Sequence, residues 1–108
     1  MLEAELLRYA KIKFEMSGLV WFRANNAPSL FNKGKKVCFK KSPMSGFTDL
    51  FGVTPLGRLY ALELKTIKGR VAPHQADCIA KINASNGIAE IARTFEEIDD
   101  FIARMKES

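Results

Sequence analysis

The sequence lacks long apolar runs, repeats and clusters of soft metal ligands. No hydrophobic stretch approaches the roughly 18 residues that span a bilayer, which argues against a membrane protein. The two cysteines, Cys38 and Cys78, do not have the spacing of a zinc site, and His74 is the only histidine. The chain opens on a charged amphipathic segment instead of a signal peptide. We therefore expect a protein of the reducing cytoplasm.

Positive charge is in excess, and it is concentrated in the first part of the chain. The net charge is +5: residues 1–48 contain nine Lys and Arg against three Asp and Glu, whereas residues 49–108 contain eight against nine. The densest basic stretch contains Lys33, Lys35, Lys36, Lys40 and Lys41. Such a stretch either lies along a polyanion or forms a solvated basic loop, and charge alone does not separate the two interpretations.

Hydrophobic periodicity predicts a mixed α/β fold. A chain of 108 residues with 47% hydrophobic residues suits one compact domain, residues 1–108. The expected helices cover residues 2–17, 74–85 and 95–105, and the expected strands cover 19–23, 36–40, 49–53, 58–65 and 88–92. Thr94 is placed to cap the last helix, with Glu97 at the capping-box position. This order predicts a mixed central β-sheet flanked by helices.

The strands at 49–53 and 58–65 are expected to form a hairpin. Its three-residue loop, with Gly57 in the left-handed conformation, would pair Thr54 with Arg58. Counting back in pairs then places Asp49 directly opposite Glu63, with Cβ atoms about 5 Å apart. Two opposed carboxylates repel each other, and a divalent cation between them would relieve the repulsion.

A lysine shares this strand face with the two acids. Lys65 lies one pleat beyond Glu63, while Leu62 and Leu64 point to the opposite face of the sheet. Carboxylate oxygens are the ligands that Mg²⁺ prefers, and a lysine can stabilise charge that develops on a phosphate. The combination favours phosphodiester hydrolysis. The competing interpretation is that the acid and the lysine form the solvated face of an edge strand.

A family resemblance is carried by two segments, GFTDLFGV and RLYALELKTIKGRVAPHQADCIAKINASNGIAEIARTFEEIDDFI. Together they resemble the virus-type replication-repair nuclease domain of the PD-(D/E)XK superfamily, over nearly the whole chain. The resemblance implies a restriction-endonuclease-like core and a DNA endonuclease that uses Mg²⁺ or Mn²⁺. It matches Asp49 to the motif's aspartate, Glu63 and Lys65 to its E-x-K, and Gln75 to a glutamine that opens the next helix. It also implies that the backbone carbonyl of Leu64 is a metal ligand.

The family pattern also has an acid in the first helix, for which the sequence offers Glu3, Glu5 and Glu15. Glu3 shares a helical stripe with Leu7 and Phe14, so we expect it to point toward the sheet. Its other interpretation is a terminal charge favoured by the helix dipole. The chain departs from the pattern at position 48, where threonine stands in place of the usual proline.

Several further residues have two interpretations each. Gln75 could bridge substrate or water to the site, or could cap its helix. Lys68 and Arg70 follow the E-x-K strand and would contact DNA phosphates or solvate a turn. Trp21 and Phe22 alternate on one strand, so one of them is expected in the core.

The leading functional hypothesis is an endonuclease for branched or Holliday-junction DNA in replication, recombination or repair. We expect a homodimer, because two active sites are needed to cut both strands of a junction in a coordinated way. Four apolar strand residues either form the interface or complete the core of a monomer: Val20, Phe22, Val37 and Phe39. The alternative is a non-catalytic basic DNA-binding module with a nuclease-like fold, and cleavage of RNA is a third interpretation.

Overall fold

The computed structural model describes residues 1–24, 29–33, 36–40 and 47–108, the two middle segments as backbone only. The elements are α1 (Glu3–Ser17), β1 (Val20–Arg23), β2 (Ser29–Lys33), β3 (Lys36–Lys40), β4 (Leu50–Val53), β5 (Leu59–Leu64), α2 (Pro73–Ala84), β6 (Ile88–Ala92) and α3 (Phe95–Lys106). Four strands form a sheet in the order β1-β4-β5-β6, in which only the β5–β6 pair is parallel. The fold is therefore mixed α/β and compatible with a restriction-endonuclease-like core, as predicted.

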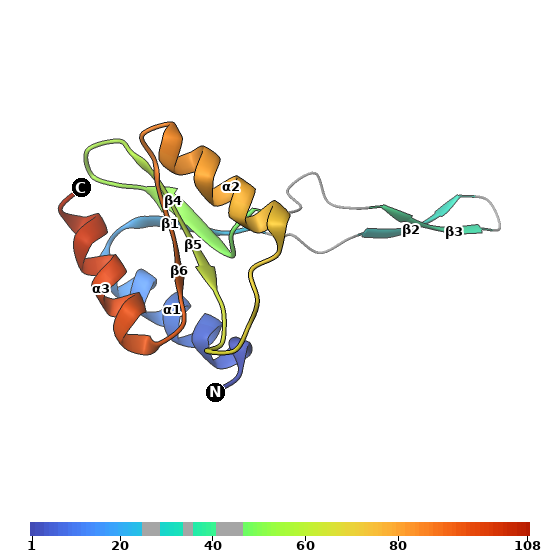
Figure 1. Cartoon of the computed structure of the whole chain (residues 1–108), viewed down its shortest axis with the longest axis horizontal. Helices are drawn as coiled ribbons and strands as arrows, with labels where there is room; N and C mark the ends of the chain where they lie inside the picture. Colours follow the sequence, from blue (N-terminus) through green and yellow to red (C-terminus); the bar gives the residue numbers. More distant parts are fainter. Residues whose placement is uncertain (25–28, 34–35, 41–46) are drawn as a thin grey trace.

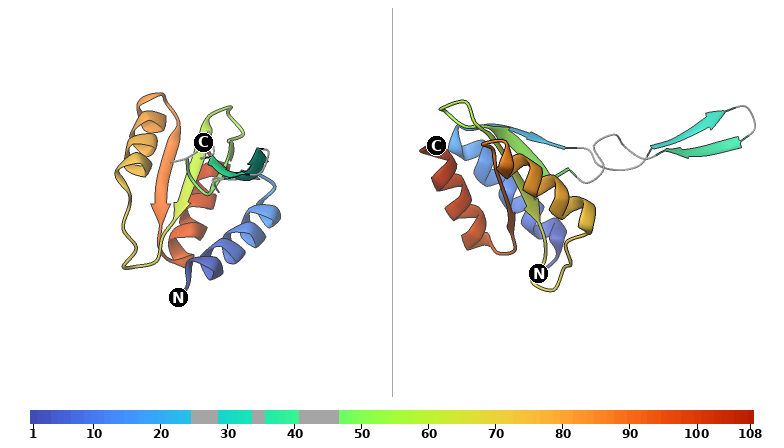
Figure 2. Two further views of the ribbon diagram at one scale, coloured as in Figure 1. Left: turned by 90° about the vertical axis from the view of Figure 1, so that its right-hand side faces the viewer. Right: turned by 45° about the horizontal axis from the view of Figure 1, so that its top comes forward.

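Helices cover both faces of this sheet (Figure 1). Helices α1 and α3 pack on one face, where Tyr60, Leu62 and Leu64 of β5 join the larger hydrophobic core. On the other face Ala61 packs against Ile82 of α2. Figure 2 shows the three layers from two further directions. Strand β5 is thus covered on both sides, which accounts for its nearly continuous apolar sequence.

The predicted hairpin is confirmed, including its register. Gly57 has a φ of 87°, its N–H donates to the carbonyl of Thr54 at 2.9 Å, and the N–H of Thr54 donates to the carbonyl of Arg58 at 2.8 Å. The strands pair Phe51 with Ala61, so a type I turn closed by a left-handed glycine sets the alignment of β4 and β5.

Helix ends follow the signals expected from the sequence. Gly18 ends α1 with a φ of 79°, and the Thr94 side chain caps α3 by accepting the Glu97 N–H at 3.1 Å. The Glu97 carboxylate accepts from the N–H of Arg93, one residue before the position that a standard capping box uses. Helix α1 has 15 residues, and none of the described helices is long and apolar enough to cross a membrane.

The basic region differs from the expectation. Strand β3 has its predicted bounds, but it pairs with β2, which was not predicted, in a two-stranded ribbon that projects from the sheet (Figure 1). Residues 29–33 contain only two apolar residues, Leu30 and Phe31, which are adjacent. They show neither the alternation of a half-buried strand nor the longer apolar run of a buried one.

A close contact between strands explains the glycine in β4. The Tyr60 hydroxyl donates to the carbonyl oxygen of Val20 at 2.7 Å. A Cβ atom on Gly52 would collide with that carbonyl and would lie 2.5 Å from the Tyr60 hydroxyl. Glycine therefore lets β1, β4 and the ring of Tyr60 approach each other on the α1 side of the sheet.

Candidate metal centre

Three carboxylates from separate elements meet at one end of the sheet. Glu3 opens α1, Asp49 directly precedes β4, and Glu63 lies in β5. One oxygen from each lies within 4.8 Å of the others. The structure thus brings together Asp49 and Glu63, which the predicted hairpin register placed opposite each other, and Glu3, the acid expected from the first helix.

The hairpin holds Asp49 beside Glu63. The register pairs Leu50 with Leu62, and its continuation by one residue places the two acids opposite each other. Asp49 Oδ2 also accepts the backbone N–H of Leu64 at 2.8 Å. This bond uses one carboxylate oxygen of Asp49 to fix its position, so the distance between the acids is set by backbone structure.

Glu63 is buried in a manner unusual for an acid. Its residue exposure is 2%, and its Oε2 has no hydrogen-bond partner among the described residues. Burial raises the pKa of Glu63 to about 9, with Asp49 and Glu3 contributing and Lys65 opposing the rise. Without a cation, this carboxyl therefore retains its proton at neutral pH, because a buried charge without compensation is costly.

The donor set fits a hard divalent cation. Carboxylate oxygens are the ligands that Mg²⁺ and Mn²⁺ take, and the buried Oε2 of Glu63 is an acceptor that such an ion would satisfy. The described residues of the cluster include no sulfur or imidazole donor. Glu3, Asp49 and Glu63 are therefore suited to Mg²⁺ or Mn²⁺ more than to Zn²⁺.

Lys65 and Leu64 follow Glu63 at the end of β5. The Lys65 side chain is partly buried, and its charge is close enough to lower the pKa of Glu63. The backbone N–H of Lys65 donates to the carbonyl oxygen of Ala92 at 3.1 Å, which fixes the point where the chain leaves the sheet. The N–H of Leu64 is used by Asp49, and a ligand role for the Leu64 carbonyl stays a prediction.

In the structure Gln75 caps its own helix, which was the second of the two interpretations of this residue. Gln75 Oε1 accepts the N–H of Ala72 at 3.0 Å, at the start of α2. Its role at the site stays a prediction.

Of the other acids in α1, Glu15 accepts the indole N–H of Trp21 at 3.1 Å, while Glu5 is exposed. Trp21 packs against the core, and Phe22 is the exposed member of the pair.

The loop after β5 contains an interaction that the sequence did not reveal. Lys68 and Arg70 are exposed there, as expected for residues that contact phosphates or solvate a turn. Arg93, just after β6, donates from its guanidinium to carbonyl oxygens of this loop. Its partners lie more than 20 residues earlier in the chain, so no local pattern could have indicated the contact.

The predicted basic segment is described only in part. Lys33, Lys36 and Lys40 lie on the ribbon strands, for which the backbone alone is described. Lys35 and Lys41 lie outside the described residues. Contact between this segment and DNA therefore stays a prediction from charge.

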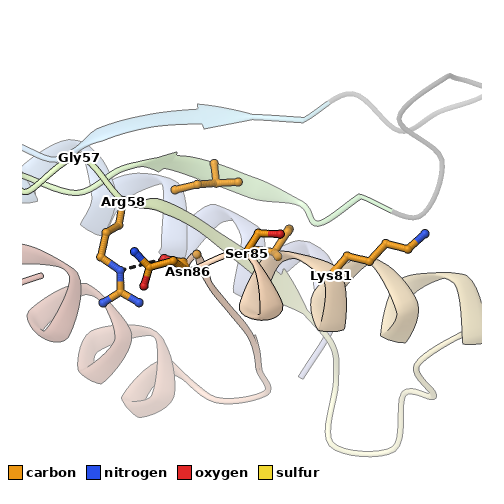
Figure 3. Close-up of a pocket in the computed structure, with 8 residues that line it drawn as sticks. Gly57, Arg58, Lys81, Ser85 and Asn86 are labelled. Carbon is orange, nitrogen blue, oxygen red and sulfur yellow. Dashed lines mark hydrogen bonds between the residues drawn. The ribbon is translucent and has the colours of Figure 1, made fainter.

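A hollow of about 400 Å³ lies between the β4–β5 turn and the end of α2 (Figure 3). Arg58 lies beside it and donates from Nε to the carbonyl of Asn86 at 3.0 Å, while Lys81 borders it from α2. None of the residues assigned to the site from the sequence lines this hollow. It is thus separate from the carboxylate cluster.

The comparisons with known proteins give no assignment. No model of a known protein family matches the chain, and no curated protein matches it.

Proposed function

We propose that the protein is a metal-dependent DNA endonuclease that hydrolyses phosphodiester bonds. The observation that carries the proposal is the buried Oε2 of Glu63, which has no hydrogen-bond partner in the described part of the chain, within a group of three carboxylates. Glu3, Asp49 and Glu63 would hold Mg²⁺ or Mn²⁺, with the Leu64 carbonyl as a further ligand. When bound, the ion polarises a phosphoryl oxygen and acidifies a coordinated water.

The remaining site residues act on the substrate. The Lys65 ammonium, close to Glu63, stabilises negative charge that develops on the phosphate during displacement. Lys68 and Arg70 bind neighbouring phosphates from the exposed loop that follows. Gln75, at the start of α2, orients substrate or water, provided its side chain can leave the backbone of Ala72.

The charge distribution is compatible with a polyanionic substrate such as DNA. Residues 1–48 contain the excess basic charge, including the basic segment with Lys33, Lys35, Lys36, Lys40 and Lys41. A basic segment of this kind can follow a phosphate backbone. Together with the family resemblance, this favours branched DNA, in which the strands diverge around the protein.

A second copy of the chain would supply a second cutting site. On β1, Val20 and Phe22 are 54% and 53% exposed. The register places them on the same sheet face as Val53 and Leu59, which are also exposed. Helix α2 contacts the β6 side of this face, and a partner subunit would cover the β1 side.

Cleavage of a DNA panel tests the proposal directly. Labelled four-way junctions, flaps and linear duplexes are incubated with the protein and Mg²⁺, Mn²⁺ or a chelator. We expect metal-dependent products, chiefly from the branched substrates, and no products with chelator. DNA that is bound but left intact with both ions would contradict the enzyme and favour the non-catalytic DNA-binding module. An equivalent RNA junction tests whether the activity is confined to DNA.

A further inference from the structure

Arg93 reaches from the end of β6 to the loop that follows β5. The two strands are parallel, so their carboxyl ends lie at the same edge of the sheet. Arg93 Nη1 donates to the carbonyl oxygens of Thr66, Ile67 and Gly69 at 2.6, 3.3 and 2.8 Å. A single guanidinium therefore holds both sides of one short turn.

This turn connects the acid-bearing strand to the basic loop residues. The N–H of Gly69 donates to the carbonyl of Thr66 at 3.0 Å, which closes the turn around Lys68. Arg70 follows directly, and the side chains of both basic residues are exposed. An exposed loop of this length has considerable conformational freedom, which charged hydrogen bonds to its carbonyls restrict.

The backbone on the Arg93 side is itself fixed. The N–H of Arg93 donates to the Glu97 carboxylate at 2.8 Å, within the cap of α3. Lys65, at the other end of the turn, is held by a separate hydrogen bond from its backbone N–H to the carbonyl oxygen of Ala92. Removal of the Arg93 side chain would therefore loosen residues 66–70, while Lys65 and the carboxylates stay in place.

We propose that Arg93 is a positioning residue that holds the 66–69 turn so that Lys68 and Arg70 bind DNA phosphates beside the carboxylate cluster. The inference rests on the proposed nuclease function. It assigns Arg93 to substrate binding, so its removal affects KM more than kcat.

Arg58 provides a matched control. It also donates from its guanidinium to a backbone carbonyl, that of Asn86, but at the hollow away from the carboxylate cluster (Figure 3). Steady-state cleavage is measured for Arg93→Met and Arg58→Met over a range of salt concentrations. Arg93→Met should raise KM by roughly tenfold, with kcat within about twofold. Its log-log salt slope should fall by up to about 1.8, because two phosphate contacts contribute about 0.9 each.

Two further variants separate positioning from general stability. Lys68→Gln combined with Arg70→Gln should reproduce the changes in KM and salt slope. Adding Arg93→Met should change them little more, because Arg93 acts only through the phosphate contacts of these two residues. Arg93→Lys keeps a cation with donors for the carbonyls, and it should restore part of the affinity.

The inference is overturned if Arg93→Met leaves KM and salt slope unchanged, or if Arg58→Met changes them equally. A wild-type protein without cleavage activity would contradict the proposed function instead. Hydrogen exchange of amides 66–70 then tests the contact without catalysis. Faster exchange of these amides in Arg93→Met but not in Arg58→Met, together with weaker DNA binding, supports the positioning role. Unchanged exchange in Arg93→Met overturns it.

Discussion

Glu63 combines deep burial with an acceptor atom that no described residue satisfies. A carboxyl in this environment has two ways to avoid an isolated charge, which are to keep its proton or to bind a cation. The proximity of Asp49 and Glu3 strengthens both responses, because each adds negative potential. Stability and metal affinity at this residue are therefore linked to pH.

Replacing Glu63 by glutamine should remove a pH dependence of stability in the metal-free protein. An unfolded glutamate ionises near pH 4.5, whereas in the folded protein the pKa of Glu63 is raised to about 9 by burial. Between these values the folded state binds the extra proton, so the free energy of unfolding falls as pH rises. Urea unfolding between pH 5 and 9 should therefore show a flatter profile for Glu63→Gln than for wild type.

A matched variant on the surface provides the control for this experiment. Glu5→Gln changes an exposed acid of α1 and should keep the wild-type pH profile. Added Mg²⁺ should stabilise the wild type more at pH 8 than at pH 6, because the ion replaces the proton. Identical slopes for wild type and Glu63→Gln would contradict the account of this side chain.

The sequence predicted that Asp49 and Glu3 would lie near Glu63, but it did not predict how deeply Glu63 is buried. The turn chemistry of Gly57 set the register, and the register opposed Asp49 and Glu63. The family resemblance pointed to an acid in the first helix, and helical geometry favoured Glu3 among the three candidates. The degree of burial could not be predicted, because it depends on how α1 and α2 close over the sheet. The reach of Arg93 depends in the same way on tertiary contacts.

The hairpin and the ribbon show why some elements are easier to predict than others. In the hairpin, strand pattern, turn residues and burial all favour one register, so β4 and β5 could be placed from the sequence. The ribbon strands β2 and β3 contain only short apolar runs, and β2 and its pairing with β3 were not predicted. A local pattern specifies a strand poorly where no core selects one of its faces.

Neutralising the lysines of the basic segment should weaken DNA binding in a salt-dependent manner. Removal of one lysine–phosphate interaction reduces the log-log salt slope of binding by about 0.9 on duplex DNA. We expect the slope to decrease stepwise as residues of the segment are changed to glutamine: Lys33, Lys35, Lys36, Lys40 and Lys41. Fluorescence anisotropy at several salt concentrations, with a catalytically inactive protein, measures the slope.

Exposed lysines of two helices serve as the comparison. Lys81→Gln on α2 and Lys106→Gln on α3 remove the same charge from other surfaces. They should leave the slope nearly unchanged. A slope that responds equally to both sets would mean that net charge, and not the basic segment, determines DNA affinity.

At the scale of the whole molecule, the sheet is covered unevenly. One face is closed by α1 and α3, and α2 lies on the other face (Figure 2). On that face Val20 and Phe22 of β1 are exposed. The sequence left open whether these apolar strand residues complete the monomer core or form an interface. For the other two residues in question, Val37 and Phe39, only the β3 backbone is described. The exposed β1 face is the basis for the expected homodimer.

Light scattering at micromolar concentration should give twice the chain mass of 12.1 kDa. Phe22→Ser combined with Val20→Ser should shift the mass to that of one chain and reduce paired cutting of a four-way junction, because both changes place hydroxyls in the interface. Met16→Gln changes another exposed apolar residue, on α1, and should leave the dimer intact. A monomeric wild type that cuts junctions and linear duplexes equally would contradict the dimer and leave the metal site unaffected.

Cleavage by Asp49→Asn tests the central claim, metal-dependent hydrolysis at the carboxylate cluster, most directly. Asparagine keeps an acceptor for the N–H of Leu64, but it removes the charge that would hold the ion and replaces the second carboxylate oxygen by an amide NH2 group. The single-turnover rate with Mg²⁺ on a labelled junction should fall by at least about a hundredfold, because metal polarisation of the phosphate contributes several kcal/mol. DNA affinity and unfolding should stay near wild type. Wild-type cleavage by this variant, with the same dependence on Mg²⁺, would contradict the account.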